Sequence, residues 1–303
     1  MFGLVSLHPR GKSAAGIVTP DEALPQATYI VRRRSHLRDP LTVGAVALLI
    51  ALVVGAVLAP LLSSYDPTRI DLRQAGLPPG PAHPMGTDQV GRDVWSRALY
   101  GGRVSLAVGL AAAAIAALLG GVLGVTAAYH GGWVDAVVTR LVDAALAMPA
   151  FFLLIAAQAI MGQGVINVIV MVSLVGWMMV ARVVRTLTLS FKEREFVLAA
   201  RALGCSGARI VLKHLVPNLA GQVGVLFALG VADSLLLEAA LSFLGIGVPP
   251  TEPSWGNMLN DAQAAILSGA WWIATFPGLL VLGTALSINL VGDRIQEMLT
   301  PRL

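Results

Sequence analysis

Charged residues are scarce in this sequence. Asp, Glu, Lys and Arg make up only 13% of its 303 residues, about half the share found in a soluble domain. The single cysteine, Cys205, leaves no internal disulfide to form and no cysteine cluster to hold a metal. The five histidines are scattered, and none forms a His-Glu-x-x-His pair. The sequence therefore predicts neither a soluble domain, nor a disulfide framework, nor a metal site.

Apolar residues dominate instead. They make up 56% of the chain, whose mean hydropathy is +0.76. A membrane-spanning helix needs about 20 mainly apolar residues, because its backbone polar groups must be satisfied within the helix. We therefore expect an all-α integral membrane protein with six transmembrane helices. The six stretches are residues 41–62, 105–129, 142–161, 165–184, 223–244 and 271–291.

The distribution of Lys and Arg predicts the orientation, since these residues favour the cytoplasmic ends of spans. With the N-terminus inside, sixteen of the 21 Lys and Arg lie on the cytoplasmic side. The other five are arginines of residues 63–103, where four aspartates accompany them. The sequence thus predicts an N-in, C-in topology. The pI of 9.6 fits this bias better than it fits nucleic-acid binding.

The predicted domains follow from these spans. Residues 1–36 have no sustained helical or strand period, and they predict a disordered cytoplasmic tail before a membrane domain of residues 37–303. The tail contains Gly-Lys-Ser at residues 11–13, but Ser6 stands where a phosphate-binding loop has its first glycine. The chain is therefore not expected to bind ATP through this motif. Residues 63–103 form the predicted outer loop.

Residues 190–218 form the predicted cytoplasmic segment between spans four and five. Its first part reads as a short helix that Gly204 stops in a left-handed conformation. Ser206 is placed to cap a second helix, and Pro217 is expected to end it. The expected apolar stripe of the first helix consists of Phe196, Ala200 and Leu203. The second helix is expected to have an apolar side of Ala208, Val211, Leu212 and Leu215, and an exposed side of Arg209 and Lys213.

Two helices this short cannot bury their own apolar stripes. They must meet the membrane surface, the spans or another protein, and the residues alone leave these alternatives open.

Ionisable and aromatic residues within the spans are candidates for the translocation path. Asp233 and Glu238 are five residues apart in span five, which puts them some 140° apart on a helix. Asp233 is the better candidate for the path, whereas Glu238 favours helix packing or a gate contact. Trp177 could line a cavity, although core packing is the commoner fate of such a residue. Asp143 is expected to form a structural ion pair with Arg140. We expect Trp255, Trp271 and Trp272 at the outer interface.

Five ordered blocks of this chain resemble the permeases of ABC importers, in particular the C-type subunits of the dipeptide, oligopeptide and nickel systems. In the cytoplasmic segment, Ala199, Ala200 and Gly204 are followed by His214, Pro217 and Asn218 in the family's spacing. Leu198 departs from the pattern, because the family has a glutamate there; Glu193 or Glu195 could take its role. The other blocks are residues 83–106, 141–149, 238–250 and 253–259.

This resemblance implies a type I ABC importer permease (MetI-like) fold in the bacterial inner membrane. It implies a non-enzymatic subunit with a homologous second permease subunit, two cytoplasmic ATPases and an extracytoplasmic binding protein as partners. ATP and Mg²⁺ would be bound by the ATPases, and no cofactor by this chain. The coupling contact with an ATPase would be made by Ala199, Ala200, Gly204, Arg209, His214, Pro217 and Asn218.

Dipeptides or oligopeptides are the substrates that this resemblance favours. The alternatives are nickel or another small solute in the same type of complex. A different class, the stand-alone secondary transporter, often shows internal repeats. We find no convincing repeat here, and the cytoplasmic segment has no evident purpose in such a protein.

Overall fold

The computed structural model describes residues 39–299, apart from the side chains of residues 266, 267 and 299. Within this range the chain is helical, with one isolated bridge between Thr87 and Asp93. The all-α prediction is confirmed, and the predicted tail at residues 1–36 lies outside the described range. The elements are α1 (Pro40–Val57), α2 (Ala59–Leu62), η2 (Leu72–Gln74), α3 (Val94–His130), α4 (Gly132–Leu146), α5 (Ala150–Met161), α6 (Val165–Lys192), α7 (Glu195–Ala202), α8 (Gly207–Ile210), the π-helical turn η3 (Val211–Leu215), α9 (Val216–Phe243), α10 (Trp255–Leu267) and α11 (Trp272–Leu299).

Five helical runs in the described part are long and apolar enough to cross a membrane: α1, α3, α6, the run from α8 through α9, and α11. A sixth span arises only if α4 and α5 count together, and these two helices bend by 93°. The predicted span over residues 142–161 is therefore interrupted: it comprises the end of α4, a bend and α5. Pro149 explains the break, because proline has no backbone N–H and disfavours a helical conformation at the preceding Met148.

The long helix α3 packs against α6 and α9 through small residues. A side chain at Gly120 would come within 2.5 Å of the Trp177 carbonyl oxygen on α6, and one at Gly124 within 2.7 Å of the Ala181 carbonyl oxygen. Gly109 similarly faces Val231 of α9. Such close backbone approach is typical of helix pairs in membranes, where apolar burial does not drive association.

The helix α3 begins eleven residues before the predicted span, at Val94 rather than at residue 105. Asp93 caps it, since its carboxylate accepts a 2.7 Å hydrogen bond from the Ser96 amide. The predicted outer loop of residues 63–103 therefore includes the first turns of α3. We call residues 63–93, which precede α3, the outer segment. It consists of η2 and several turns.

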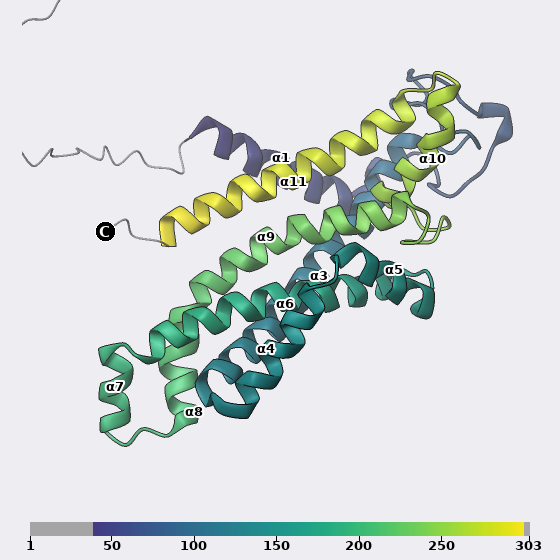
Figure 1. The fold of residues 1–303 in the computed structure, drawn as a ribbon. Coiled ribbons are helices and arrows are strands. Elements are labelled where there is room, and N and C mark those ends of the chain that lie inside the picture. Colours follow the sequence, from purple (N-terminus) through teal and green to yellow (C-terminus); the bar gives the residue numbers. More distant parts are fainter. Residues whose placement is uncertain (1–38, 300–303) are drawn as a thin grey trace, which may run out of the picture. The chain divides into compact units, whose positions relative to one another are not determined.

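The helices α1 and α11 run side by side, and α9 lies next to α11 (Figure 1). At one end of this bundle α10 and the outer segment come together, and α7 and α8 lie at the other end (Figure 1). Trp255 of α10 is buried between α3 and α9, and its indole N–H donates a 2.8 Å hydrogen bond to the Ala98 carbonyl. Trp272 is also buried, whereas Trp271 is exposed. Of the three tryptophans expected at the outer interface, Trp255 and Trp272 therefore pack within the protein, and Trp271 is the one whose ring is exposed.

Candidate coupling segment and translocation path

The helix α7 of the cytoplasmic segment begins and ends close to where the sequence predicted. Its last turn closes with a hydrogen bond of 3.1 Å from the Cys205 amide to the Ala200 carbonyl, and one of 3.0 Å from Gly204 to Arg201. Gly204 has φ 77°, a left-handed conformation that costs other residues about 1–2 kcal/mol. The predicted glycine elbow is confirmed.

The apolar face of α7 differs from the predicted stripe. Val197 and Ala200 are buried, whereas Leu203 is 84% exposed and Phe196 is 38% exposed. Val197 and Ala200 are three residues apart and pack into a cluster with Ile210, Leu215 and Leu219, together with Val125 of α3 and Val180 and Val184 of α6. This cluster, which we call the base cluster, anchors the segment to the membrane helices. Leu203 cannot join it, because the chain leaves the helix at that point.

The second predicted helix is not a separate element. Ser206 occupies the capping position of α8, but its side chain makes no capping hydrogen bond. After α8 the π-helical turn η3 leads directly into α9, so that Pro217 lies in the first turn of α9 instead of ending a helix. The first turn of a helix tolerates proline, because the missing N–H would have no partner there. A wider turn before it also relieves the clash that a proline ring causes in an α-helix.

Tight contacts hold the segment against the ends of α3 and α6. The Lys192 ammonium donates to the Ala128 carbonyl at 3.3 Å. A side chain at Gly207 would come within 3.0 Å of the Tyr129 hydroxyl. The Asn218 amide donates to the His214 carbonyl at 2.6 Å, and the His214 ring lies 6.4 Å from that of Phe196. Movement of the segment must therefore move α3, α6 and α9.

The outward side of the segment combines apolar and basic side chains that are exposed. Leu198, in the place of the family's glutamate, is 45% exposed. Ala199 and Pro217 are exposed as well. Arg201, Arg209 and Lys213 are exposed and form no ion pair with the described residues. Glu193 and Glu195 are exposed at the start of α7. Ala200, in contrast, lies in the base cluster and cannot contact a partner directly.

The three predicted path residues are not brought together. Trp177 is 6% exposed and packs in a core cluster with Ala116, Val142, Met178 and Ala181. Glu238 is fully buried: Ser105 of α3 and Ser242 each donate to its carboxylate at 2.8 Å. The Trp255 amide in turn donates to the Ser105 hydroxyl at 3.1 Å. Glu238 thus joins α3, α9 and α10. Only Asp233 is exposed.

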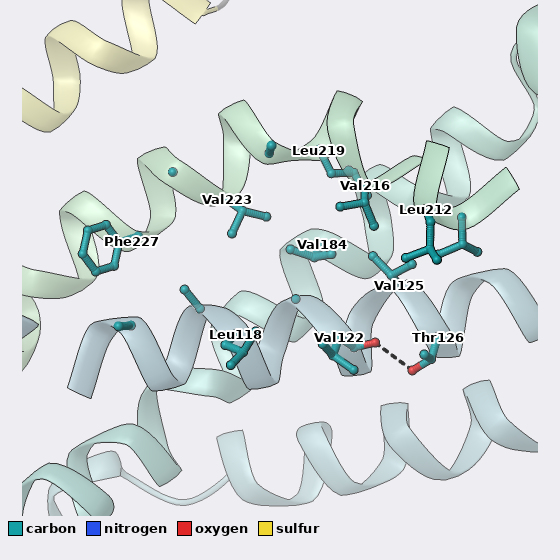
Figure 2. A pocket seen from close by; sticks show the side chains of 16 residues that line it. Leu118, Val122, Val125, Thr126, Val184, Leu212, Val216, Leu219, Val223 and Phe227 are labelled. Carbon is teal, nitrogen blue, oxygen red and sulfur yellow. Dashed lines mark hydrogen bonds between the residues drawn. The ribbon is translucent and has the colours of Figure 1, made fainter. Parts of the chain in front are cut away.

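An apolar cavity of about 660 Å³ lies between α3 and α9 near the predicted cytoplasmic segment. Figure 2 shows Val216, Val223 and Phe227 of α9 facing Leu118 and Val122 of α3 across it. The Thr126 hydroxyl is its one side-chain polar group, and it donates to the Val122 carbonyl. Val211 and Leu212 of η3 also line the cavity. The cavity can hold apolar groups, and its wall includes part of the predicted cytoplasmic segment.

The outer end holds a network of ion pairs that sequence reasoning did not predict. Asp88 pairs with Arg92 and Arg97, and both arginines also pair with Asp261 of α10, at 2.7 and 3.0 Å. The side chain of Arg97 is only 2% exposed. Beside this network, one ring nitrogen of His83 lies within hydrogen-bond distance of the Asp93 carboxylate, at 2.8 Å, and the other lies 2.9 Å from the side-chain oxygen of Gln74. The unusual number of charges in residues 63–103 was the available signal, because a charge in a buried segment needs a partner.

Two ion pairs also fasten α4 to α6. Asp143 pairs with Arg182, not with Arg140 as expected, and Asp135 pairs with Arg185. No group of three or more His, Cys, Asp or Glu in the described residues is arranged to hold a metal ion.

Comparison with known families defines the class of protein. Residues 120–303 match the model of the binding-protein-dependent transport system inner membrane component. Residues 33–79 match the N-terminal transmembrane domain of oligopeptide transport permease C. The chain therefore belongs to the family of inner-membrane permease subunits of binding-protein-dependent transport systems, and it is a multi-pass protein of the bacterial inner membrane.

Particular relatives cover most of this chain. It is 38% identical over 266 residues to the dipeptide transport system permease protein DppC of Bacillus subtilis, which covers 88% of this chain and 83% of the relative. It is 40% identical over 277 residues, 91% of both chains, to a Brucella suis protein provisionally named a peptide transport system permease protein. A second Brucella suis protein, provisionally named a peptide permease, is 36% identical over 284 residues, 93% of this chain and 94% of its own.

Proposed function

We propose that this chain is one of two membrane subunits of an ATP-driven importer for dipeptides or oligopeptides. The substrate class is supported by the relatives, which are named as dipeptide or peptide permeases. These relatives are 36–40% identical to this chain over almost its whole length. The proposed topology has six spans, with α4 and α5 forming one broken span, and both termini in the cytoplasm. The excess of Lys and Arg outside residues 63–103 supports this orientation.

The observation that carries the coupling role is the exposed surface of the cytoplasmic segment. Leu203 is 84% exposed at the elbow, and Arg201, Arg209 and Lys213 of the same segment are exposed as well. Exposed apolar side chains on a segment with exposed polar ones are typical of a protein–protein contact. We infer that an ATPase subunit binds here, and that Ala199, Gly204, His214, Pro217 and Asn218 position the contact. ATP and Mg²⁺ bind to that partner and not to this chain.

Transport follows from a two-state equilibrium that ATP binding shifts. Closure of two ATPases would move the two coupling segments, and the base cluster would transmit this movement to α3, α6 and α9. The shift requires that the ATPase contact the segment differently in the inward-facing and outward-facing states. The complete importer has a homologous second permease subunit, two ATPases and an extracytoplasmic binding protein.

Purification of the tagged chain from its own membranes tests this proposal. We expect two ATPase chains and a second permease subunit to copurify. The reconstituted complex, with its binding protein, should take up peptides only when ATP is supplied, across a panel of di-, tri- and pentapeptides with Ni²⁺ for comparison. Uptake by the isolated chain without ATP would instead identify a secondary transporter. ATP-dependent uptake of Ni²⁺ but of no peptide would overturn the substrate class.

A further inference from the structure

Asp233 lies deep in the membrane-spanning part of α9. It is ten residues before the last residue of α9, Phe243, a rise of about 15 Å along a helix. The hydrocarbon core of a bilayer is about 30 Å thick. Taking the end of α9 as one edge of the hydrocarbon core places the carboxylate near the middle of the bilayer, where ionisable groups are costly and mark ion or substrate paths.

The other acidic residues of α3, α4, α6 and α9 have partners within the chain. Glu238 accepts hydrogen bonds from two serines, and Asp135 and Asp143 pair with arginines of α6. Asp233, in contrast, is exposed and makes no hydrogen bond or ion pair with the described residues. Asp293 of α11 is also exposed, but it lies only six residues before the end of its helix at Leu299. Asp233 is thus the unpartnered carboxylate at mid-membrane depth.

The side of α9 that carries Asp233 is only partly packed, because Leu229 and Leu237 contact the rest of the chain while Asp233 itself is exposed. Ala232, Ser234 and Leu235 next to it are buried, whereas Leu236, three residues on, is 44% exposed. An ionised carboxylate facing lipid chains is strongly disfavoured, so this side of the helix must face water or a polar surface. A solute path between this subunit and the second permease subunit satisfies that requirement.

This chain holds no cation that could pair with Asp233 at that depth. No Lys or Arg occurs in residues 104–129 of α3, 165–181 of α6, or 272–292 of α11, and α9 itself contains none. A cation must come from outside the chain. Every peptide with a free N-terminus supplies one, because its α-amino group is protonated at neutral pH.

We propose that Asp233 binds the protonated amino terminus of the peptide as it passes through the membrane. This inference rests on the proposed function, because it takes peptides as the substrate. A carboxylate recognises an ammonium through a charge-assisted hydrogen bond that is independent of the peptide's side chains. One residue can therefore serve peptides of many sequences. Asp233 would be a substrate-binding residue of the path, whereas Glu238, five residues on, holds the helices together.

Uptake by the complete reconstituted complex tests the proposal. The probe is the free-amine dipeptide that the wild-type complex takes up fastest. We expect Asp233→Asn to lower its maximal uptake rate about tenfold or more, the loss typical of one hydrogen bond to a charged group. Binding-protein-stimulated ATP hydrolysis should stay within about twofold of the wild type, since the coupling segment is unchanged. Asp233→Glu, which keeps the charge, should retain more uptake than Asp233→Asn. Asp293→Asn is the matched control and should transport normally.

Each other outcome has a distinct meaning. Normal uptake by Asp233→Asn overturns the inference and leaves the proposed function intact. Loss of the second permease subunit from the purified Asp233→Asn complex also overturns it, because Asp233 then pairs with that subunit and not with the substrate. A wild-type complex that takes up no peptide overturns the proposed function, and the inference with it.

Chemical accessibility gives a readout independent of transport rate. In a Cys205→Ser background, Asp233→Cys should react with a membrane-impermeant, positively charged thiol reagent when the complex is intact. Reaction shows that water reaches residue 233. A thiol that stays unmodified in both nucleotide-free and ATP-bound complexes would contradict a place on the path.

Discussion

The two ends of this molecule treat their charges in opposite ways. At the outer end, Asp88, Arg92, Arg97 and Asp261 are joined in one network, and Arg97 is almost completely buried. At the end that we propose to be cytoplasmic, Arg201, Arg209 and Lys213 are exposed without ion pairs in the described part of the chain, and Leu203 of the same segment is 84% exposed. The buried charges of the outer end pair within the chain, although Arg97 Nε has no hydrogen-bond partner among the described residues, whereas the other end presents a surface that another protein can complete. Mutations at the outer end should therefore change stability, and those at the cytoplasmic end should change coupling.

The largest expected effect is on stability, at the outer end. Arg97→Leu removes the most buried member of the network and leaves Asp88 and Asp261 with Arg92 as their remaining partner; removal of one member of a buried ion pair costs up to about 3–5 kcal/mol. Unfolding of the purified protein in mixed detergent and SDS measures this free energy. Arg73→Ala, at an exposed arginine of the same segment, is the control and should change it by less than about 0.5 kcal/mol. Equal stability of both variants would show that the network does not hold the outer end.

Gly204→Pro should uncouple ATP hydrolysis from transport. Proline holds φ near −65°, whereas Gly204 has φ 77°. It also removes the hydrogen bond from the Gly204 amide to Arg201. We expect peptide uptake in proteoliposomes to fall at least about tenfold, while membrane insertion is unchanged. Uptake at the wild-type rate would contradict a role for the elbow.

Gly204→Ala is the milder variant at the same position. No atom lies within 4 Å of the added methyl group, so only the left-handed conformation opposes it, at about 1–2 kcal/mol. The uptake rate should lie between those of the wild type and Gly204→Pro. A loss of uptake as severe as that of the proline variant would indicate that the added methyl group clashes sterically, and that the cost of the left-handed conformation is not the cause.

Ala200→Leu should act through packing and not through contact with a partner. Ala200 lies in the base cluster, where extra methyl groups cost about 1–3 kcal/mol. The same change at the exposed neighbour Ala199 should leave stability within about 0.5 kcal/mol. Unfolding in mixed detergent and SDS compares the two. A larger loss for Ala199→Leu would reverse our assignment of the inner and outer sides of α7.

Several parts of this structure could be predicted from the sequence. The apolar runs identify the membrane helices because the bilayer imposes their length, and Gly204 identifies the end of α7 because few other residues adopt its conformation. The resemblance of five blocks predicts the family, which the comparisons confirm.

Other parts depend on contacts between distant residues. The pairing of Arg97 with Asp261 joins positions 164 residues apart, and no local pattern specifies it. The apolar stripe of α7 was misplaced because Phe196, Val197, Ala200 and Leu203 allow two faces, and only packing against Val184 and Leu215 selects Val197. Pro217 was expected to end a helix, but the π-helical turn before it allows the chain to continue into α9.

Retention of the ATPase subunits during purification tests the central claim most directly. Leu203→Asp places a charge on the exposed leucine of the cytoplasmic segment, and Leu72→Asp does the same to a 72% exposed leucine of the outer segment. Neither side chain is buried, so neither variant should unfold the chain. We predict that Leu203→Asp loses the ATPase chains from the detergent-purified complex, whereas Leu72→Asp retains them. Retention of both ATPases by Leu203→Asp, with wild-type peptide uptake, would contradict the account.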